Sequence, residues 1–155
     1  MKLIIFTILL FCSGLVLSQE QEVCNKLECV DDNFKKKNYV KYYNILNKTL
    51  VDARGCKDTN KLDNVLEFTI KIKSVAPRER MAKFIEKEFI NNPSCFLSAM
   101  KKISPEARFK AVLYLAKPTY TNGKKINDIL DKYKEQYPTE IQLIFKERER
   151  LLMGK

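Results

Sequence analysis

The chain has 155 residues, and its 29 lysines and arginines outnumber its 19 aspartates and glutamates, which gives a formal net charge of +10. It contains no histidine, which excludes Ser-His-Asp and Cys-His nucleophiles, imidazole general bases and histidine-containing zinc sites. Its four glycines lie too far apart to form a Gly-rich phosphate-binding loop. These properties argue against an enzyme, and we expect no cofactor.

Residues 1–18 have the pattern of a secretory signal peptide. Lys2 precedes a nearly unbroken apolar run from Leu3 to Leu17, and compact residues lead to a predicted cleavage after Ser18. A membrane anchor is the alternative, but the run is shorter than the ~20 residues that a spanning helix needs. We therefore expect residues 19–155 to be a secreted, extracellular domain without a transmembrane segment.

Secretion determines how the cysteines are interpreted. Cys12 lies in the predicted signal peptide, so an even number of cysteines enters the oxidising compartment, and we expect two disulfides. Three pairings are open. A bridge between the first two would need a non-helical N-terminus, because residues five apart do not face each other on a helix. The expected disulfide cysteines are Cys24, Cys29, Cys56 and Cys95.

Apolar residues recur every three or four positions along most of the remaining chain, which predicts about six amphipathic helices. We expect their apolar stripes to face one another in a core rather than to lie on a membrane, because short breaks separate them. The predicted fold is therefore a single all-α domain. The helical stripes lie within residues 39–53, 62–69, 77–89, 96–103, 109–116 and 126–137, with a last stripe at 141–152 that only Pro138 separates from the one before it.

Several breaks between these stripes carry recognisable signals. Gly55 is predicted to end the first helix. Asn92-Pro93 is predicted to end one helix and to begin the next. The clearest start is Ser104-Pro105-Glu106, which combines a hydroxyl cap, a proline where no N–H is needed and a carboxylate near the positive helix end. Residues 118–123 are predicted to form a loop.

Residues 68–73 are ambiguous. Phe68, Ile70 and Ile72 alternate with polar residues, which is typical of a strand. No second strand of similar quality is present to pair with it, and a lone strand leaves its backbone unsatisfied. We therefore favour a helix here.

Two motifs suggest a covalent modification and a contact with another molecule. Asn47-Lys48-Thr49 is the only N-glycosylation sequon, which predicts a glycoprotein if the chain is secreted. The lysine run Lys35, Lys36 and Lys37 lies beside aromatic residues and is a candidate patch for polyanions, acidic lipid headgroups or cell-surface sugars. A solvated helix face is the simpler interpretation of this run.

Two groups of oxygen-bearing side chains are candidates for calcium or magnesium: residues 31–33 (Asp-Asp-Asn) and Asp58, Asn60 and Asp63. Neither matches an EF-hand loop. Both groups stand where helices begin, so helix capping is the simpler interpretation, and the identity of any metal ligand stays open.

From residue 103 onward the chain is similar to a known family. Ile103-Ser104-Pro105-Glu106-Ala107-Arg108 leads into one helix, Thr121-Asn122-Gly123-Lys124-Lys125-Ile126 leads into another, and a proline turn precedes Ile141. This order resembles the C-terminal half of the SXP/RAL family of small secreted helical worm antigens. The resemblance implies a helical, cation-binding, non-enzymatic protein. The four cysteines and the missing tryptophan depart from the family pattern.

Two functional hypotheses follow. The first is a secreted, non-enzymatic helical binding protein that holds a small apolar ligand or a divalent cation. The second is a basic secreted effector that binds anionic surfaces or host receptors. We expect no nucleic-acid partner, because the chain is predicted to be secreted and carries no recognised nucleic-acid-binding motif.

Overall fold

The computed structural model describes residue 27 and residues 30–154, and these residues form helices and no strand. The predicted signal peptide, Cys24 and Cys29 lie outside the described residues. Within residues 30–154, eight α-helices and two 3-10 helices follow one another in this order: α1 (Asp32–Lys37), α2 (Tyr39–Asp52), η2 (Arg54–Cys56), α3 (Thr59–Phe68), η3 (Thr69–Lys71), α4 (Val75–Asn91), α5 (Pro93–Lys102), α6 (Pro105–Ala116), α7 (Gly123–Tyr133) and α8 (Pro138–Met153).

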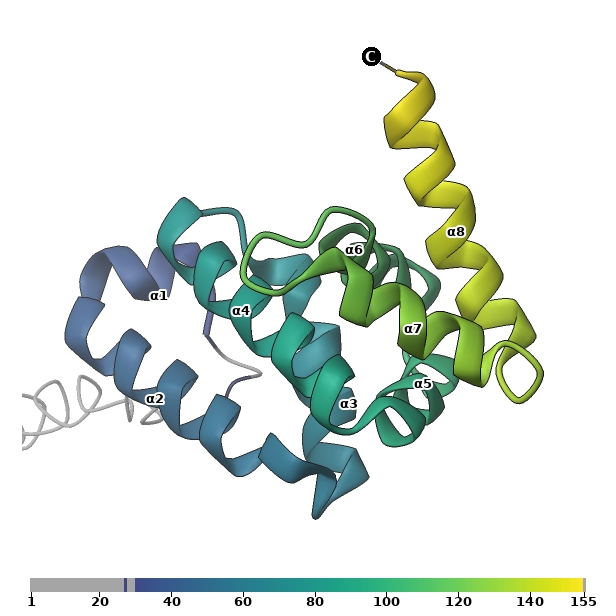
Figure 1. The fold of residues 1–155 in the computed structure, drawn as a ribbon. Coiled ribbons are helices and arrows are strands. Elements are labelled where there is room, and N and C mark those ends of the chain that lie inside the picture. Colours follow the sequence, from purple (N-terminus) through teal and green to yellow (C-terminus); the bar gives the residue numbers. More distant parts are fainter. Residues whose placement is uncertain (1–26, 28–29, 155) are drawn as a thin grey trace, which may run out of the picture.

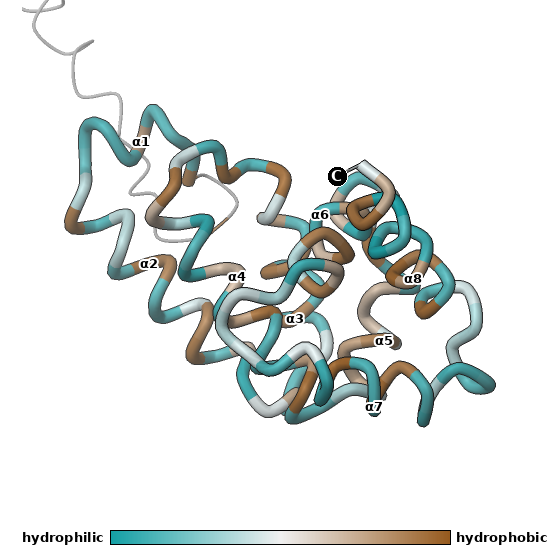
Figure 2. Tube along the Cα trace, turned by 45° about the horizontal axis from the view of Figure 1, so that its top comes forward, coloured by the Kyte–Doolittle hydropathy of each residue, from teal (hydrophilic) through white to brown (hydrophobic). Residues whose placement is uncertain are grey.

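The prediction of an all-α fold is confirmed for the described residues, but the predicted number of about six helices is too low. One helix that the apolar stripes do not reveal is α1, which has six residues and buries none of them. It is hydrophilic along most of its length (Figure 2). Periodicity detects a helix by its buried face, and α1 has no such face.

The predicted start and stop signals position several helix ends. Ser104 caps α6, since its Oγ accepts the N–H of Ala107 at 3.3 Å, and Pro105 occupies the first turn. The break at Asn92-Pro93 separates α4 from α5. Gly55 lies just after α2 with a φ of 71°, a left-handed conformation that glycine adopts without a steric penalty.

The helices enclose one cluster of buried apolar side chains that extends from Leu27 to Ile144. Figure 1 shows α1 and α2 at one end of the molecule and α8 at the other, where its last turns project from the body. The main helix pairs are α6 with α8 and α3 with α5. Burial of each large side chain contributes about 1.5–3 kcal/mol. The largest buried residues include Tyr42, Leu46, Leu62, Leu66, Met81, Ile85, Phe89, Phe96, Met100, Leu115 and Ile126.

Some residues of the predicted stripes do not face this core. Tyr39 is 61% exposed, Phe109 50% and Leu152 70%. The buried residues of α6 are Ala107, Ala111, Val112 and Leu115. A helix that is apolar on several sides has no single face that the sequence marks as buried.

The ambiguous segment at residues 68–73 is neither a strand nor a continuous helix. Phe68 ends α3, Thr69–Lys71 forms the 3-10 helix η3, and Ile72 is extended with a φ of −85° and a ψ of 110°. Thr69 donates its hydroxyl hydrogen to the carbonyl of Leu66 at 2.7 Å, which satisfies that buried hydroxyl. The prediction of a helix is therefore correct only for the first part of the segment.

One disulfide lies among the described residues and joins Cys56 to Cys95, whose Cα atoms are 6.3 Å apart. It links the η2 turn to the first turn of α5. Glu88 of α4 strengthens the same region, because its Oε1 accepts the N–H of Gly55 at 3.0 Å and the Nδ2 of Asn92 at 2.8 Å. The η2 turn is therefore fixed to both α4 and α5.

None of the helices within residues 30–154 is both long enough and apolar enough to span a bilayer.

Candidate functional site

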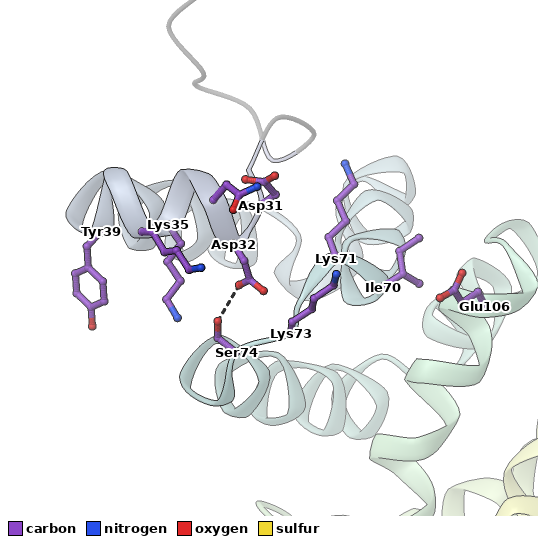
Figure 3. A pocket seen from close by; sticks show the side chains of 11 residues that line it. Asp31, Asp32, Lys35, Tyr39, Ile70, Lys71, Lys73, Ser74 and Glu106 are labelled. Carbon is purple, nitrogen blue, oxygen red and sulfur yellow. Dashed lines mark hydrogen bonds between the residues drawn. The ribbon is translucent and has the colours of Figure 1, made fainter.

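A groove of about 1040 Å³ lies between α1 and the chain that runs from η3 into α4. We call it the α1 groove. Figure 3 shows the side chains that line it, with Lys35 on the α1 wall and Lys73 on the opposite wall. The residues that define the groove are Asp31, Asp32, Asn33, Lys35, Lys36, Tyr39, Ile70, Lys71, Lys73, Ser74 and Glu106.

The first wall of the groove is α1, whose short length is supported at both ends. Asp31 precedes it, and its Oδ1 accepts the N–H of Phe34 at 2.7 Å. At the other end the N–H of Asn38 donates to the carbonyl of Phe34 at 2.8 Å. Lysines fill the last turn, where a positive charge interacts favourably with the helix dipole. The acidic residues at the start of α1 and the lysines at its end therefore stabilise a helix that has no buried residue.

The two walls are joined by a hydrogen bond between side chains 42 residues apart. Ser74 Oγ donates to Asp32 Oδ1 at 2.8 Å, which connects the start of α4 to the start of α1 (Figure 3). The second wall is also braced on its own side, because Arg78 Nη2 donates to the carbonyl of Lys73 at 2.7 Å. Hydrogen bonds from Ser74 and Arg78 thus hold the backbone on each side of the groove in place.

Two cation–π contacts link α1 and α2. Lys35 Nζ is 5.9 Å from the ring centre of Tyr42, and Lys41 Nζ is 6.0 Å from that of Phe34. Such cation–π contacts orient an ammonium group without neutralising its charge. Burial raises the pKa of Tyr42 to about 12, with a smaller contribution from the Asp32 carboxylate. The Tyr42 phenol is therefore neutral at physiological pH and adds no negative charge here.

The charges of the α1 groove are mixed but positive in sum. Four lysines line it together with three carboxylates, those of Asp31, Asp32 and Glu106. Asp31 and Asp32 each accept a hydrogen bond from the protein, so both carboxylates also have a structural role. The groove is suited to a ligand whose negative charges are spaced rather than continuous.

The structure separates the three lysines that the sequence grouped. Lys35 and Lys36 line the groove, whereas the exposed Lys37 is not among its lining residues. Lys71 and Lys73 line the opposite wall and were not predicted. The alternation in residues 68–73 did not identify them, because Thr69–Lys71 forms a 3-10 helix and the apolar Ile70 lines the same groove.

The other predicted site residues lie elsewhere. Asn47 is exposed on α2, and its Oδ1 accepts a hydrogen bond from Arg80 Nη1 at 2.7 Å. Arg80 in turn lies 4.8 Å from the ring centre of Tyr43. The amide nitrogen of Asn47, which would carry a glycan, is not used in this contact.

The two groups of oxygen-bearing side chains act as caps and ion-pair partners. Asp58 Oδ1 accepts the N–H of Asn60 at 3.0 Å at the start of α3, and Asp63 pairs with Lys102 at 3.8 Å. The interpretation of Asp31 and Asp58 as helix caps is confirmed. Residues 27 and 30–154 contain no group of three or more cysteine, aspartate or glutamate side chains placed to hold a metal ion.

Comparison of the chain with protein-family models, with curated proteins and with solved structures finds no match. The resemblance of the C-terminal half to the SXP/RAL family therefore stays a prediction from residues 103–141.

Proposed function

We propose that this chain is a secreted, non-enzymatic binding protein that holds a linear polyanion, such as a sulfated polysaccharide, in the α1 groove. The observation that carries the proposal is that Lys35 and Lys36 share this groove with Lys71 and Lys73 from the opposite wall. Several ammonium groups around one hollow favour a ligand with several negative charges.

The shape of the site favours a chain over a membrane surface. The lysines line a groove of about 1040 Å³, which a narrow chain can enter and a flat bilayer cannot. The three carboxylates of the groove would also repel a continuous layer of anionic headgroups, whereas a chain can position its sulfates beside the lysines alone. Tyr39, which is 61% exposed at the groove, offers an aromatic face to a sugar ring.

The test is binding of heparin to the disulfide-intact protein across a series of salt concentrations. We expect the affinity to fall as salt rises, because screening weakens contacts between exposed charges. Replacing three groove lysines, by Lys35→Ser, Lys36→Ser and Lys73→Ser, should weaken binding about tenfold at about 0.1 M salt, if each contact contributes about 0.5 kcal/mol.

A matched control separates the groove from the net charge of the protein. Lys124→Ser, Lys125→Ser and Lys134→Ser remove the same charge from exposed positions in and just after α7. We expect this variant to bind heparin almost as the unmodified protein does. Equal losses in the two variants would contradict a site at the α1 groove. Tighter binding to vesicles of anionic lipid than to heparin would replace the polysaccharide by a membrane surface.

A further inference from the structure

A second groove, of about 910 Å³, lies between α2 and α3. We call it the α2 groove. It is lined from α2 by residues such as Lys41, Ile45 and Lys48, and from α3 by residues such as Lys61 and Phe68. Its volume is within the range of about 300–1,000 Å³ that is usual for small-molecule sites. It is adjacent to the α1 groove, since the residues of η3 border both.

The floor of the α2 groove is apolar and comes from four segments of the chain. Leu27 precedes α1, Ile45 belongs to α2, Phe68 ends α3 and Ile70 lies in η3. The first three are at the edge of the buried core, and Ile70 is half-buried against it. The floor is therefore the edge of the core, and a ligand lying on it would extend the same apolar packing.

The rim of the α2 groove is basic. Lys41 and Lys48 are seven residues apart on α2, which puts them on the same side of that helix, and Lys61 lies on α3. The groove also contains the carboxylates of Asp52 and Glu67. Glu67 accepts hydrogen bonds from the backbone N–H and, at 2.8 Å, the Oγ of Ser104, so its carboxylate is engaged with the start of α6.

We propose that the α2 groove binds an amphiphilic carboxylate of the fatty-acid class. The acyl chain would lie on the floor formed by Ile45, Phe68 and Ile70, and the carboxylate would interact with Lys41 or Lys48 on the rim. Each methylene that leaves water contributes about 0.8 kcal/mol, so the length of the chain determines the affinity. The ammonium groups determine which end of the ligand is recognised. This site differs from the α1 groove, where spaced negative charges are recognised and no acyl chain is needed.

The test is titration of the protein with oleate, methyl oleate and hexanoate below their aggregation concentrations, by calorimetry. Oleate should bind saturably and raise the melting temperature, since a ligand of the native state stabilises it. Methyl oleate lacks the negative charge and hexanoate lacks most of the chain, so each should bind at least about tenfold more weakly. Absence of saturable oleate binding, or equal binding of oleate and its methyl ester, would overturn the proposal.

Variants locate the site. Lys41→Ser with Lys48→Ser changes only the rim and should weaken oleate about tenfold without affecting methyl oleate. Ile70→Ser changes the floor and should weaken both ligands, whereas Ile129→Ser, at a half-buried position on α7, should weaken neither. An unchanged oleate affinity in the Lys41→Ser and Lys48→Ser variant would overturn the assignment of the carboxylate.

The groove variant used for heparin distinguishes this proposal from the proposed function. Lys35→Ser, Lys36→Ser and Lys73→Ser should reduce heparin binding and leave oleate binding unchanged, because these residues do not line the α2 groove. If the triple variant abolishes oleate binding, the acid binds in the α1 groove and the inference is wrong, whatever the outcome with heparin.

Discussion

The carboxylate of Glu86, in the middle of α4, accepts the backbone N–H of Thr119 at 2.8 Å, although the two residues are 33 positions apart. It also accepts the N–H of Tyr120 at 2.7 Å and the hydroxyl of Thr121 at 3.0 Å. Glu86 is buried, and the loop between α6 and α7 has no regular structure of its own to satisfy these donors. One side chain of α4 therefore fixes the path of this loop.

We expect Glu86→Gln to lower the free energy of unfolding by about 2–3 kcal/mol, because the amide keeps one acceptor oxygen and turns its NH2 group toward donors that the other oxygen had satisfied. Chemical denaturation measures this change. Glu79→Gln, at an exposed position on the same helix, is the control and should change stability by less than about 0.5 kcal/mol. A similar small effect for Glu86→Gln would mean that water replaces the carboxylate.

The disulfide between Cys56 and Cys95 reduces the three possible pairings to one. If secretion removes Cys12 and the four remaining cysteines are all oxidised, the second bridge joins Cys24 to Cys29. We expect peptide mapping without reduction to recover both pairs, with no mixed pair between them. Recovery of a free thiol at either of the first two cysteines would contradict the prediction of two disulfides.

Removing the observed bridge should be costly. The Cys56→Ala and Cys95→Ala double variant opens a link across 39 positions, for which loop-closure entropy predicts a loss of about 4 kcal/mol. Thermal unfolding of the variant against the oxidised protein measures the loss. A change below about 1 kcal/mol would show that Glu88 and its contacts hold the η2 turn without the bridge.

Local rules predicted the parts of the fold that depend on neighbouring residues. Ser104 and Asp58 are caps because a side-chain oxygen next to a helix start satisfies a backbone N–H nearby, so the sequence contains all that is needed. Orientation was harder to predict. The apolar residues of α6 include Phe109, which is exposed, and Ala111, which is buried, and only the neighbouring helices determine which side faces inward.

The candidate site depends on contacts that no local rule contains. Lys35 and Lys36 were visible as a charge run, but Lys71 and Lys73 join them only in the fold, where Ser74 binds Asp32 and links α4 to α1. The same limit applies to Glu86, whose surroundings in the sequence are those of an ordinary surface glutamate. Sequence patterns identify charged residues, whereas the fold determines which of them meet.

The exposed sequon on α2 predicts a glycan at Asn47 when the chain passes through a eukaryotic secretory pathway. Intact-mass measurement should then show a carbohydrate increment that peptide-N-glycosidase removes and that Asn47→Gln abolishes. Arg80 binds the side-chain oxygen of Asn47, so Arg80→Ala should leave the modification in place. A secreted product with the mass of the bare chain would refute the prediction.

The stability of the protein should depend on the ionisation of Asp63. Burial raises the pKa of this carboxyl, Lys102 lowers it, and the nearby carboxylates of Asp58 and Glu67 raise it further, so the net shift is upward from 3.8. The folded state thus binds the proton more tightly than the unfolded state. The contribution of Asp63 to the free energy of unfolding is present in full below pH 3.8. It is lost as the pH rises from there through the raised pKa of the folded state.

Asp63→Asn removes this ionisation and should therefore gain stability relative to the unmodified protein as the pH rises from 3.8 to neutrality. Denaturation of both proteins at a series of pH values measures the difference. Asp128→Asn, which removes an exposed carboxylate from α7, controls for the change in net charge. If Asp63→Asn instead loses stability relative to the unmodified protein over the same pH interval, attraction to Lys102 outweighs the cost of burying the carboxylate.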